Sequence, residues 1–340
     1  MNDRNYPLLT KLFLDLEVEL HPTSMSFGVE TDNLKWCSND FLKLRFLGSL
    51  KKIRLFFEII KFNNLAPHAK SNYSIEEWLK ENKFSKFFKE NYIYPMSASI
   101  WSSSQESINR FPMSSLSSFF KNHGLLDLIK RPQWFSVLGG SNTYIEKLIK
   151  RSKIKNIITS ANVLIKRGKE NIFVQNNDKT HQYDAVIFAC HADQVAETLN
   201  DMSAEEQEIL SMFEYTSNNV LLHCDSSLMP KEKPLWSSWN SFKNNEYDYV
   251  SYWMNNLQKL DSKTDIFVTL GNYPNASEEK IFKKISYHHP LYSKKTLQGQ
   301  KLIKSIQGNN KIYFTGAHLG YGFHEDGIKS SLEVIKIING

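Results

Sequence analysis

Residues 311–340 form the part of this sequence that most restricts its possible folds. An apolar run, Ile312–Phe314, leads into a loop with four glycines and then into a pattern with helical periodicity. The glycines are Gly316, Gly320, Gly322 and Gly327. Glycines allow close backbone approach, and a helix N-terminus offers unpaired N–H groups and a positive dipole end. This order predicts an α/β fold with a site for a phosphate or another electron-rich group, although it also suits a tight connection without a ligand.

Composition indicates a folded protein of mixed charge. The 340 residues are 41% hydrophobic and 13% aromatic, which excludes a disordered chain and provides for two domains or one large one. The net charge of +6 comes from lysines interleaved with acidic residues, so we expect solvated faces and no nucleic-acid partner. Contact of a basic protein with an anionic membrane surface is compatible with this balance.

The termini, cysteines and histidines indicate a cytoplasmic protein without a metal site. The N-terminus is polar and lacks an apolar signal core, and no apolar run is long enough to cross a membrane. Cys37, Cys190 and Cys224 are widely spaced, without a C-x-x-C pair, so we expect reduced thiols. The pair His288–His289 has no third ligand at metal spacing.

Apolar periodicity predicts a mainly helical region up to Leu138. Helices are expected over 7–16, over 41–64 and after the capping box of Ser74 and Glu77. A further helix is expected over 142–151 and a second capping box at Ser203 and Glu206.

Strand signals begin after residue 150. We expect strands over 154–158, 162–165, 171–174, 183–189, 220–223, 247–253 and 266–270. The continuous apolar run at 183–189 predicts a strand buried on both faces. Strands within 154–190 and at 311–316 are expected to pair in parallel, across a long insertion.

Motifs along nearly the whole chain carry a resemblance to a known group of proteins. They include Pro95-Met-Ser-Ala-Ser-Ile-Trp101, Ala189-Cys-His-Ala-Asp193, Trp236-Ser-Ser-Trp-Asn240 and Phe314-Thr-Gly-Ala-His-Leu-Gly-Tyr-Gly-Phe-His-Glu-Asp-Gly-Ile328. In these motifs the chain resembles bacterial predicted NAD/FAD-binding proteins of the flavin-containing amine oxidase superfamily.

The resemblance implies an α/β flavoprotein with a Rossmann-type FAD domain and an inserted substrate domain of helices and strands. The substrate domain would comprise 1–133, mainly helical, and 196–299, rich in β-structure. The FAD domain would comprise 134–195 and 300–340. Its implied cofactor-binding residues are Val163, Ala189, Gly316, Ala317, Asp326, Gly327 and Ile328.

One unit of the family pattern has no counterpart here. The family begins with a strand, a G-x-G-x-x-G turn, a helix and a second strand, which hold the FAD diphosphate and ribose. No G-x-G-x-x-G occurs in these residues; in the C-terminal loop Glu325 stands where a third glycine would fall. We therefore predict an incomplete FAD domain that binds FAD poorly alone, and a separate N-terminal FAD-binding piece as partner.

The site candidates each have a structural alternative. We expect Asp326 to cap the last helix, whereas His324 is either the catalytic candidate or a packing residue beside the flavin. Trp101, Trp134 and Trp253 are candidates for an apolar substrate pocket, or else core residues.

The resemblance implies an FAD-dependent oxidoreductase, like an amine oxidase or a desaturase, that transfers a hydride from substrate to flavin. The aromatic, apolar helical region favours an acyl or lipid-like substrate and work at the inner membrane face. The alternative is a truncated, inactive remnant, or a subunit that needs an N-terminal partner to bind FAD.

Overall fold

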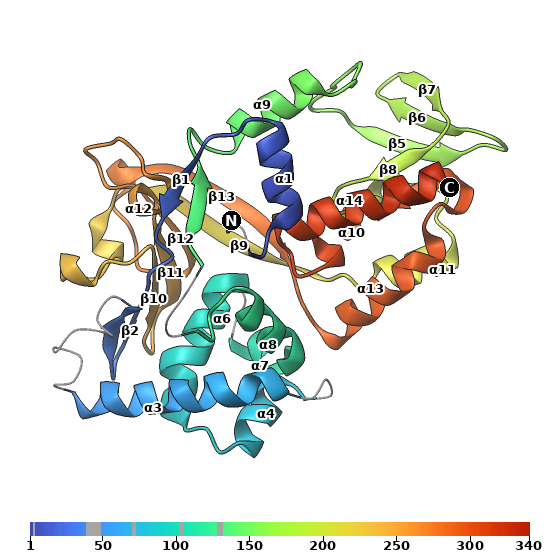
Figure 1. Ribbon diagram of the computed structural model, residues 1–340. Coiled ribbons are helices and arrows are strands. Elements are labelled where there is room, and N and C mark those ends of the chain that lie inside the picture. Colours follow the sequence, from blue (N-terminus) through green and yellow to red (C-terminus); the bar gives the residue numbers. More distant parts are fainter. Residues whose placement is uncertain (3, 39–48, 70–72, 102–104, 128–131) are drawn as a thin grey trace. The chain divides into compact units, whose positions relative to one another are not determined.

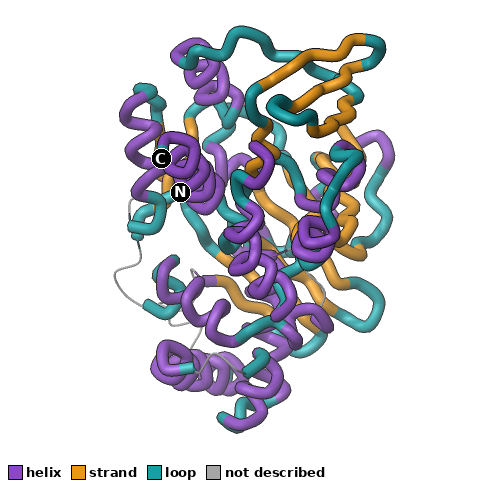
Figure 2. The backbone as a smooth tube through the Cα atoms, turned by 90° about the vertical axis from the view of Figure 1, so that its right-hand side faces the viewer, coloured by secondary structure: helices purple, strands orange, loops and turns teal. Residues whose placement is uncertain are grey.

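The computed structural model describes residues 1–2, 4–38, 49–69, 73–101, 105–127 and 132–340 (Figure 1). Helices and strands both make up large parts of the chain (Figure 2). The chain divides into two compact units of separated segments. Unit 1 is Met1–Asn5, Val18–Thr143 and Thr216–His289, and unit 2 is Tyr6–Glu17, Tyr144–Tyr215 and Pro290–Gly340. The assignment of cofactor and substrate roles to parts of the chain stays a prediction.

Unit 1 is built on a seven-stranded sheet of order β13-β9-β12-β11-β10-β2-β3. Its strands are β2 (Phe27–Thr31), β3 (Lys35–Cys37), β9 (Tyr215–His223), β10 (Trp239–Lys243), β11 (Asp248–Trp253), β12 (Phe267–Asn272) and β13 (Ile281–Pro290). Pairs along the middle are antiparallel, while β10 and β2 are parallel, with Trp239 opposite Phe27. A smaller antiparallel pair joins β1 (Leu20–Thr23) to β4 (Trp134–Val137).

Helices between β3 and β4 enclose an aromatic core in unit 1. They are α3 (Leu50–Leu65), α4 (Ile75–Glu81), α5 (Lys86–Phe88), α6 (Tyr94–Trp101), α7 (Gln105–Arg110) and α8 (Met113–Asn122), and α12 (Met254–Gln258) follows β11. The fully buried ring of Phe62 lies about 6 Å from the rings of Trp78, Phe84, Phe88 and Phe120. The expected capping box of Ser74 and Glu77 is confirmed at the start of α4.

Unit 2 contains a two-stranded parallel sheet of β8 (Val186–Phe188) and β14 (Ile312–Phe314). This confirms the expected parallel pairing across a long insertion. Beside it lies an antiparallel sheet of β5 (Val163–Arg167), β6 (Ile172–Asn176) and β7 (Lys179–Tyr183). The helices are α1 (Pro7–Asp15), α9 (Asn142–Arg151), α10 (Ala192–Thr198), α11 (Ala204–Leu210), α13 (Lys294–Ile306) and α14 (His324–Asn339).

The core of unit 2 lies on one face of the parallel sheet. Phe188 and Phe314 stack with ring centroids 5.8 Å apart, and they pack against buried residues of α10, α11 and α13. The capping box of Ser203 and Glu206 is confirmed at the start of α11. The expected helices over 7–16 and 142–151 are confirmed as α1 and α9.

Several expectations differ from the structure. Residues 154–158 form no strand, since this segment has no backbone partner in the described part of the chain. The strand at 183–189 is shorter, and it is not buried on both faces, because Ile187 is 48% exposed. The region up to Leu138 also holds β1 to β4, four short strands without strong periodicity. The helix expected over 41–64 is α3 from Leu50; residues 41–48 lie outside the described residues.

Candidate functional site

The candidate site lies in unit 2, where the parallel strands end. β14 leads into Thr315 and Gly316, and β8 leads into Ala189 and Cys190. Because both strands run in the same direction, these segments emerge at the same edge of the sheet, where open α/β sheets bind ligands. Two helices, α10 and α14, begin after the segments. The sheet thus brings together two stretches that are far apart in the sequence, each leading from a strand into a helix.

Side chains of α14 and α13 hold the glycine-rich loop in place. The Gly316 N–H donates to Ser330 Oγ over 3.0 Å, and Ser330 Oγ lies 2.8 Å from Thr315 Oγ1. Gln300 Nε2 donates to the carbonyls of His318, at 2.9 Å, and Gly320, at 2.6 Å. With its carbonyls and amides bonded on both sides, the loop has a fixed backbone path.

Gly316 in the loop and Gly327 in α14 have different surroundings. A Cβ atom at Gly316, whose φ is 156°, would come within 2.7 Å of the His318 ring, so a side chain does not fit there. At Gly327 in the first turn of α14, the nearest atom to an added Cβ would be the Ala317 backbone nitrogen, at 3.9 Å. The loop at Ala317 and the start of α14 therefore run side by side without a side chain between them.

The two carboxylates in the first turn of α14 have partners within unit 2. Asp326 Oδ2 accepts from the N–H groups of Tyr321 and Phe323, both over 3.0 Å, and burial raises the pKa of Asp326. Since Phe323 is the residue before the helix, this confirms that Asp326 caps α14. Glu325 accepts from the N–H groups of Leu8 and Leu9, each over 2.9 Å. His324 is the exposed first residue of α14.

The segment after β8 combines an exposed backbone with an aromatic support. Ala189 is exposed, and Tyr215 Oη accepts from the Ala192 N–H over 2.9 Å. The His191 ring stacks on Tyr215 with centroids 4.5 Å apart. Burial raises the pKa of Tyr215 to about 12, so its hydroxyl stays protonated at neutral pH. It therefore acts as a fixed hydrogen-bonding group at the start of α10.

His318 is a buried neutral side chain below the glycine loop. Burial first, and then the His191 ring, lower the pKa of His318 to about 4. Its ring meets the Phe213 ring edge-on at 5.1 Å. A neutral imidazole beside Gly316 adds no positive charge to the site, so the attraction for an anion must come from backbone N–H groups and the α14 dipole.

Of the seven expected cofactor residues, Gly316 and Ala317 follow β14, and Asp326, Gly327 and Ile328 lie at the start of α14. Ala189 follows the adjacent strand, and half-buried Val163 begins β5, opposite Asn176. The roles of these residues stay predictions. Sequence reasoning missed Ser330 and Gln300, which bond to the loop, and Tyr215, which bonds to the start of α10. Serine and glutamine within a helix carry no distinctive signal.

The three tryptophan candidates lie in unit 1, in two places. Trp101 and half-buried Trp134 belong to one row of rings: Trp101 lies 4.9 Å from Phe119, which stacks on His123 at 3.8 Å, and His123 lies 5.9 Å from Trp134. Trp253 is the last residue of β11, outside this row, and its Nε1 donates to Asp265 over 2.9 Å. Their contact with a substrate stays a prediction.

The described ranges contain neither a cluster of metal ligands nor a helix that could cross a membrane. No group of three or more His, Cys, Asp or Glu residues in them could hold a metal ion. None of the helices there combines the length and the apolar character that crossing a membrane requires.

Comparison with known proteins gives matches in structure alone; no protein-family model and no curated protein matches the sequence. A fatty acid isomerase from P. acnes that produces CLA matches with a TM-score of 0.67 at 11% identity, over 98% of this chain and 84% of the other. Putrescine oxidase bound to putrescine matches with a TM-score of 0.67 at 10% identity, over 98% of this chain and 86% of the other. The chain has the flavin amine oxidase fold.

Cyclohexylamine oxidase from Brevibacterium oxydans has this fold as well, with a TM-score of 0.60 and 9% identity over 98% of this chain and 85% of the other. The predicted mixed α/β fold is confirmed, and the predicted resemblance to amine oxidases is confirmed at the level of the fold. In each of these three comparisons this chain accounts for 84–86% of the matched protein, which has additional residues.

Proposed function

We propose that this chain is an FAD-dependent oxidoreductase that transfers a hydride from an organic substrate to the flavin. One observation carries the proposal. A glycine-rich loop connects a parallel strand to a helix N-terminus, beside the end of the neighbouring parallel strand, in a chain with the flavin amine oxidase fold. At Gly327 an added Cβ would have the Ala317 backbone nitrogen as its nearest atom, at 3.9 Å, and this spacing is compatible with a cofactor beside the backbone.

The residues at this edge fit the flavin end of FAD. Ala317, Gly327 and Ile328 would lie along the ribityl chain and the pyrimidine ring, next to the N-terminus of α14. A helix N-terminus stabilises a nearby anion by about 0.3–1 kcal/mol at exposed sites, and reduced flavin is anionic on this side. Since the Asp326 and Glu325 carboxylates already accept N–H groups of unit 2, the chain holds these negative charges in fixed positions.

Bound FAD would supply the hydride acceptor, and the protein would supply orientation and a dry site. We propose an apolar substrate with an acyl or other lipid-like chain, because the helices of unit 1 are rich in aromatic side chains. The row of rings from Trp101 to Trp134 belongs to this aromatic region, and half-buried Trp134 is the member of the row that is not buried. His123 in this row is neutral at pH 7, since burial lowers its pKa to about 4.

A second candidate is a subunit whose FAD site is completed by another polypeptide segment. β14 has its outer edge covered, because Gln307 bonds to both the N–H and the carbonyl of Phe314, at 2.9 and 2.6 Å. β8 pairs with β14 along one edge, and among the described strands none pairs with its opposite edge. The Ile187 side chain of β8 is 48% exposed. A two-stranded parallel sheet is rare, since parallel sheets are normally larger and covered on both faces.

Other exposed apolar side chains of unit 2 favour this second candidate further. Ile154, Ile157 and Ile158 are each more than half exposed, and Leu332 and Ile335 of α14 are 39% and 48% exposed. Exposed apolar groups of this size mark an interaction surface. A strand–helix–strand segment with a glycine-rich turn would pair with β8, cover these side chains and supply the missing diphosphate site. On this proposal, the isolated chain is inactive.

The first experiment is a titration with FAD of the purified chain, alone and together with the strand–helix–strand segment of the second candidate, followed by quenching of flavin fluorescence. Gly327→Asp places a negative charge beside the proposed flavin site, and we expect it to weaken binding at least tenfold. Asn339→Asp adds the same charge at the far end of α14 and should leave affinity unchanged. Equal affinities in both variants would place FAD away from this loop.

The substrate class is tested by anaerobic mixing of the flavin-loaded protein with candidate substrates. An unsaturated fatty acid should bleach the flavin absorbance, whereas a polyamine should not. Bleaching by the polyamine alone would exclude the acyl substrate while leaving the oxidoreductase proposal intact.

A further inference from the structure

Helix α3 of unit 1 carries apolar side chains on two faces. Leu55, Ile59 and Phe62 are buried and form the inner face. Leu50 and Phe57 lie on a different face and are 85% and 64% exposed. A surface helix needs one apolar stripe to pack on its core, so the folding of unit 1 does not explain the second.

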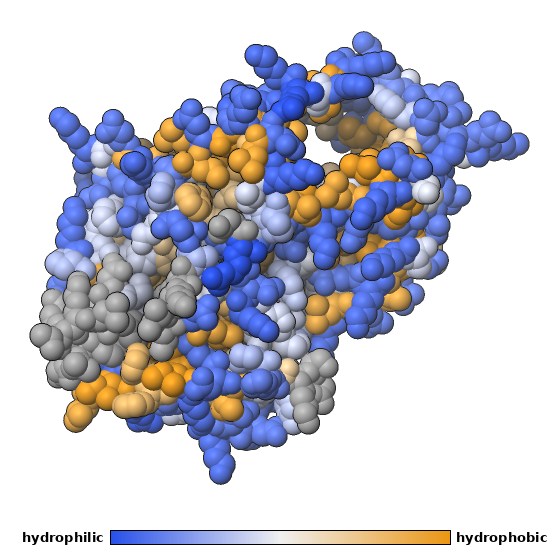
Figure 3. Space-filling view, viewed as in Figure 1, coloured by the Kyte–Doolittle hydropathy of each residue, from blue (hydrophilic) through white to orange (hydrophobic). Residues whose placement is uncertain are grey.

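The outer face is continuous along the helix. Positions 50, 53, 57 and 60 are Leu, Ile, Phe and Ile, spaced three or four residues apart, and so lie on one side. Ile53 and Ile60 are half-buried and connect the two exposed side chains. Figure 3 shows hydrophobic surface along α3, at the lower left of the view. Together they form what we call the outer stripe: Leu50, Ile53, Phe57 and Ile60.

Positive charges lie beside the outer stripe. Lys51, Arg54 and Lys61 are exposed on α3. Lys51 Nζ donates to the Asn33 carbonyl over 3.1 Å and Lys61 Nζ to the Asn82 carbonyl over 2.6 Å, so these bonds do not neutralise them. Among the described residues, no carboxylate forms an ion pair with either lysine.

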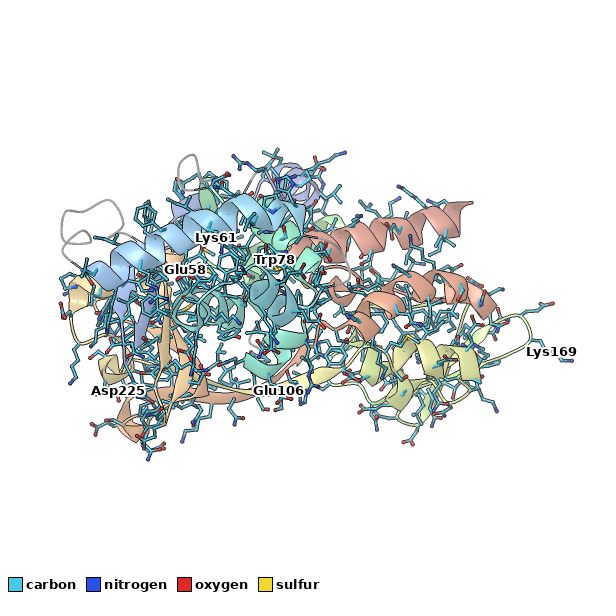
Figure 4. The ribbon with its side chains drawn as sticks, turned by 90° about the horizontal axis from the view of Figure 1, so that it is seen from below. Glu58, Lys61, Trp78, Glu106, Lys169 and Asp225 are labelled. Carbon is cyan, nitrogen blue, oxygen red and sulfur yellow. The ribbon has the colours of Figure 1, made fainter. Side chains whose placement is uncertain are left out.

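Glu58, the acidic residue of α3, bonds to Ser85 and Arg54 and not to Lys51 or Lys61. Its carboxylate accepts from the Ser85 N–H at 2.9 Å and the Ser85 hydroxyl at 2.6 Å, and it lies 3.4 Å from Arg54 Nε. Figure 4 looks onto α3 from below and shows Glu58 and Lys61 on it. Arg54 is therefore paired with Glu58, whereas Lys51 and Lys61 border the outer stripe as positive charges without an ion pair among the described residues.

We propose that α3 docks unit 1 onto a bilayer that contains anionic phospholipid, with the outer stripe in the interface. Exposed Leu and Phe enter the boundary between headgroups and acyl chains, while Lys51, Arg54 and Lys61 contact lipid phosphates. A nucleic acid would match the charges but not the apolar stripe. A lipid surface matches both, and contact through one helix face is peripheral.

The test is co-sedimentation of the full chain with phosphatidylcholine vesicles, with and without phosphatidylglycerol. We expect binding to the anionic vesicles, weaker binding to neutral ones, and a decrease with added salt. Leu50→Ser/Phe57→Ser should lower binding at least tenfold. Leu14→Ser is the matched control, because Leu14 is 73% exposed on α1 of unit 2, and it should bind like the wild type.

A second variant separates charge from apolar contact. Lys51→Gln/Lys61→Gln should weaken binding to anionic vesicles several-fold and reduce its dependence on salt. Circular dichroism is the control for whether each variant is folded. Wild-type protein that does not bind anionic vesicles, or equal binding by the Leu50→Ser/Phe57→Ser variant, overturns the proposal. Self-association that this variant abolishes, without vesicle binding, would instead make the stripe a protein interface.

Discussion

At the residue scale, two adjacent carboxylates at the start of α14 bind different parts of unit 2. Asp326 closes the glycine-rich loop onto the helix, whereas Glu325 reaches the first turn of α1. The first N–H groups of a helix have no partner within it, and a carboxylate there also interacts favourably with the helix dipole. Glu325 therefore joins two segments of unit 2 that are more than 300 residues apart in the sequence.

Glu325→Ala should destabilise unit 2 by about 1–2 kcal/mol, because it removes both acceptors from the N-terminus of α1. Urea unfolding followed by circular dichroism measures the change. Glu333→Ala is the control, since Glu333 is exposed on the same helix and should cost about 0.5 kcal/mol or less. Equal effects of the two substitutions would show that the contact with α1 contributes nothing.

A second residue-scale feature is the buried His223 in unit 1. The Asp225 N–H donates to Nδ1 over 3.1 Å, so Nε2 carries the proton and donates to Thr269 Oγ1 over 2.8 Å. Thr269 Oγ1 lies 2.6 Å from Ser251 Oγ, which donates to the Leu228 carbonyl. A second proton on Nδ1 would face the Asp225 N–H, and burial lowers the pKa of His223 to about 4.

Acidification should therefore destabilise unit 1 through His223. Above pH 6.5 the imidazole is neutral in both the folded and the unfolded chain and contributes no pH dependence. As the pH falls from 6.5 towards 4, the unfolded chain binds the proton first, and stability falls by about 1.4 kcal/mol per unit of pKa difference. Urea midpoints measured at pH 7 and pH 5 should differ less in His223→Gln than in the wild type. The same pH dependence in both proteins would contradict this assignment.

At the element scale, a buried ion cluster joins β5 to the start of α11. Arg167, at the end of β5, bonds to the carboxylates of Asp201 and Glu206, and its side chain is only 12% exposed. The Asp201 carboxylate also accepts the Arg167 N–H over 2.8 Å. Because Arg167 is the cation that both carboxylates share, its loss leaves Asp201 and Glu206 without a partner of opposite charge in this cluster.

Arg167→Met should destabilise unit 2 by about 3–5 kcal/mol, because it leaves two carboxylates without a cation. Adding Asp201→Asn and Glu206→Gln to it should recover much of this loss, since no unpaired charge remains. Differential scanning calorimetry of the single and triple variants gives the comparison. A triple variant that is less stable than Arg167→Met would show that the cluster acts through shape and not through charge.

How well elements could be predicted depends on how local their causes are. The capping boxes at Ser74 and Ser203 and the strand–loop–helix at 312–339 were predictable, because capping, glycine geometry and periodicity act between near neighbours. β2 was not predictable, because its partners β3 and β10 stabilise it more than its own residues do. The 154–158 prediction was wrong because an apolar run becomes a strand only when a partner strand is present.

At the scale of the whole molecule, the sequence predicted the positions of the candidate site but not its supports. The glycine loop and the end of β8 could be inferred from the resemblance, which also implied a missing glycine turn. The contacts of Ser330 and Gln300 with the loop depend on how α13 and α14 pack, which no local pattern specifies. The unpaired edge of β8 among the described strands and the exposed Ile187 in β8 are the features on which our proposal of a docked segment rests.

The central claim is that unit 2 is one half of an FAD site, completed at the edge of β8. The most direct measurement is the amount of FAD retained after gel filtration by the chain alone and by the chain co-expressed with a strand–helix–strand segment carrying G-x-G-x-x-G. We predict little flavin on the chain alone, near-stoichiometric flavin with the segment, and loss of that gain in Ile187→Lys. Near-stoichiometric flavin on the chain alone, or none on the folded chain with the segment bound, would contradict the claim.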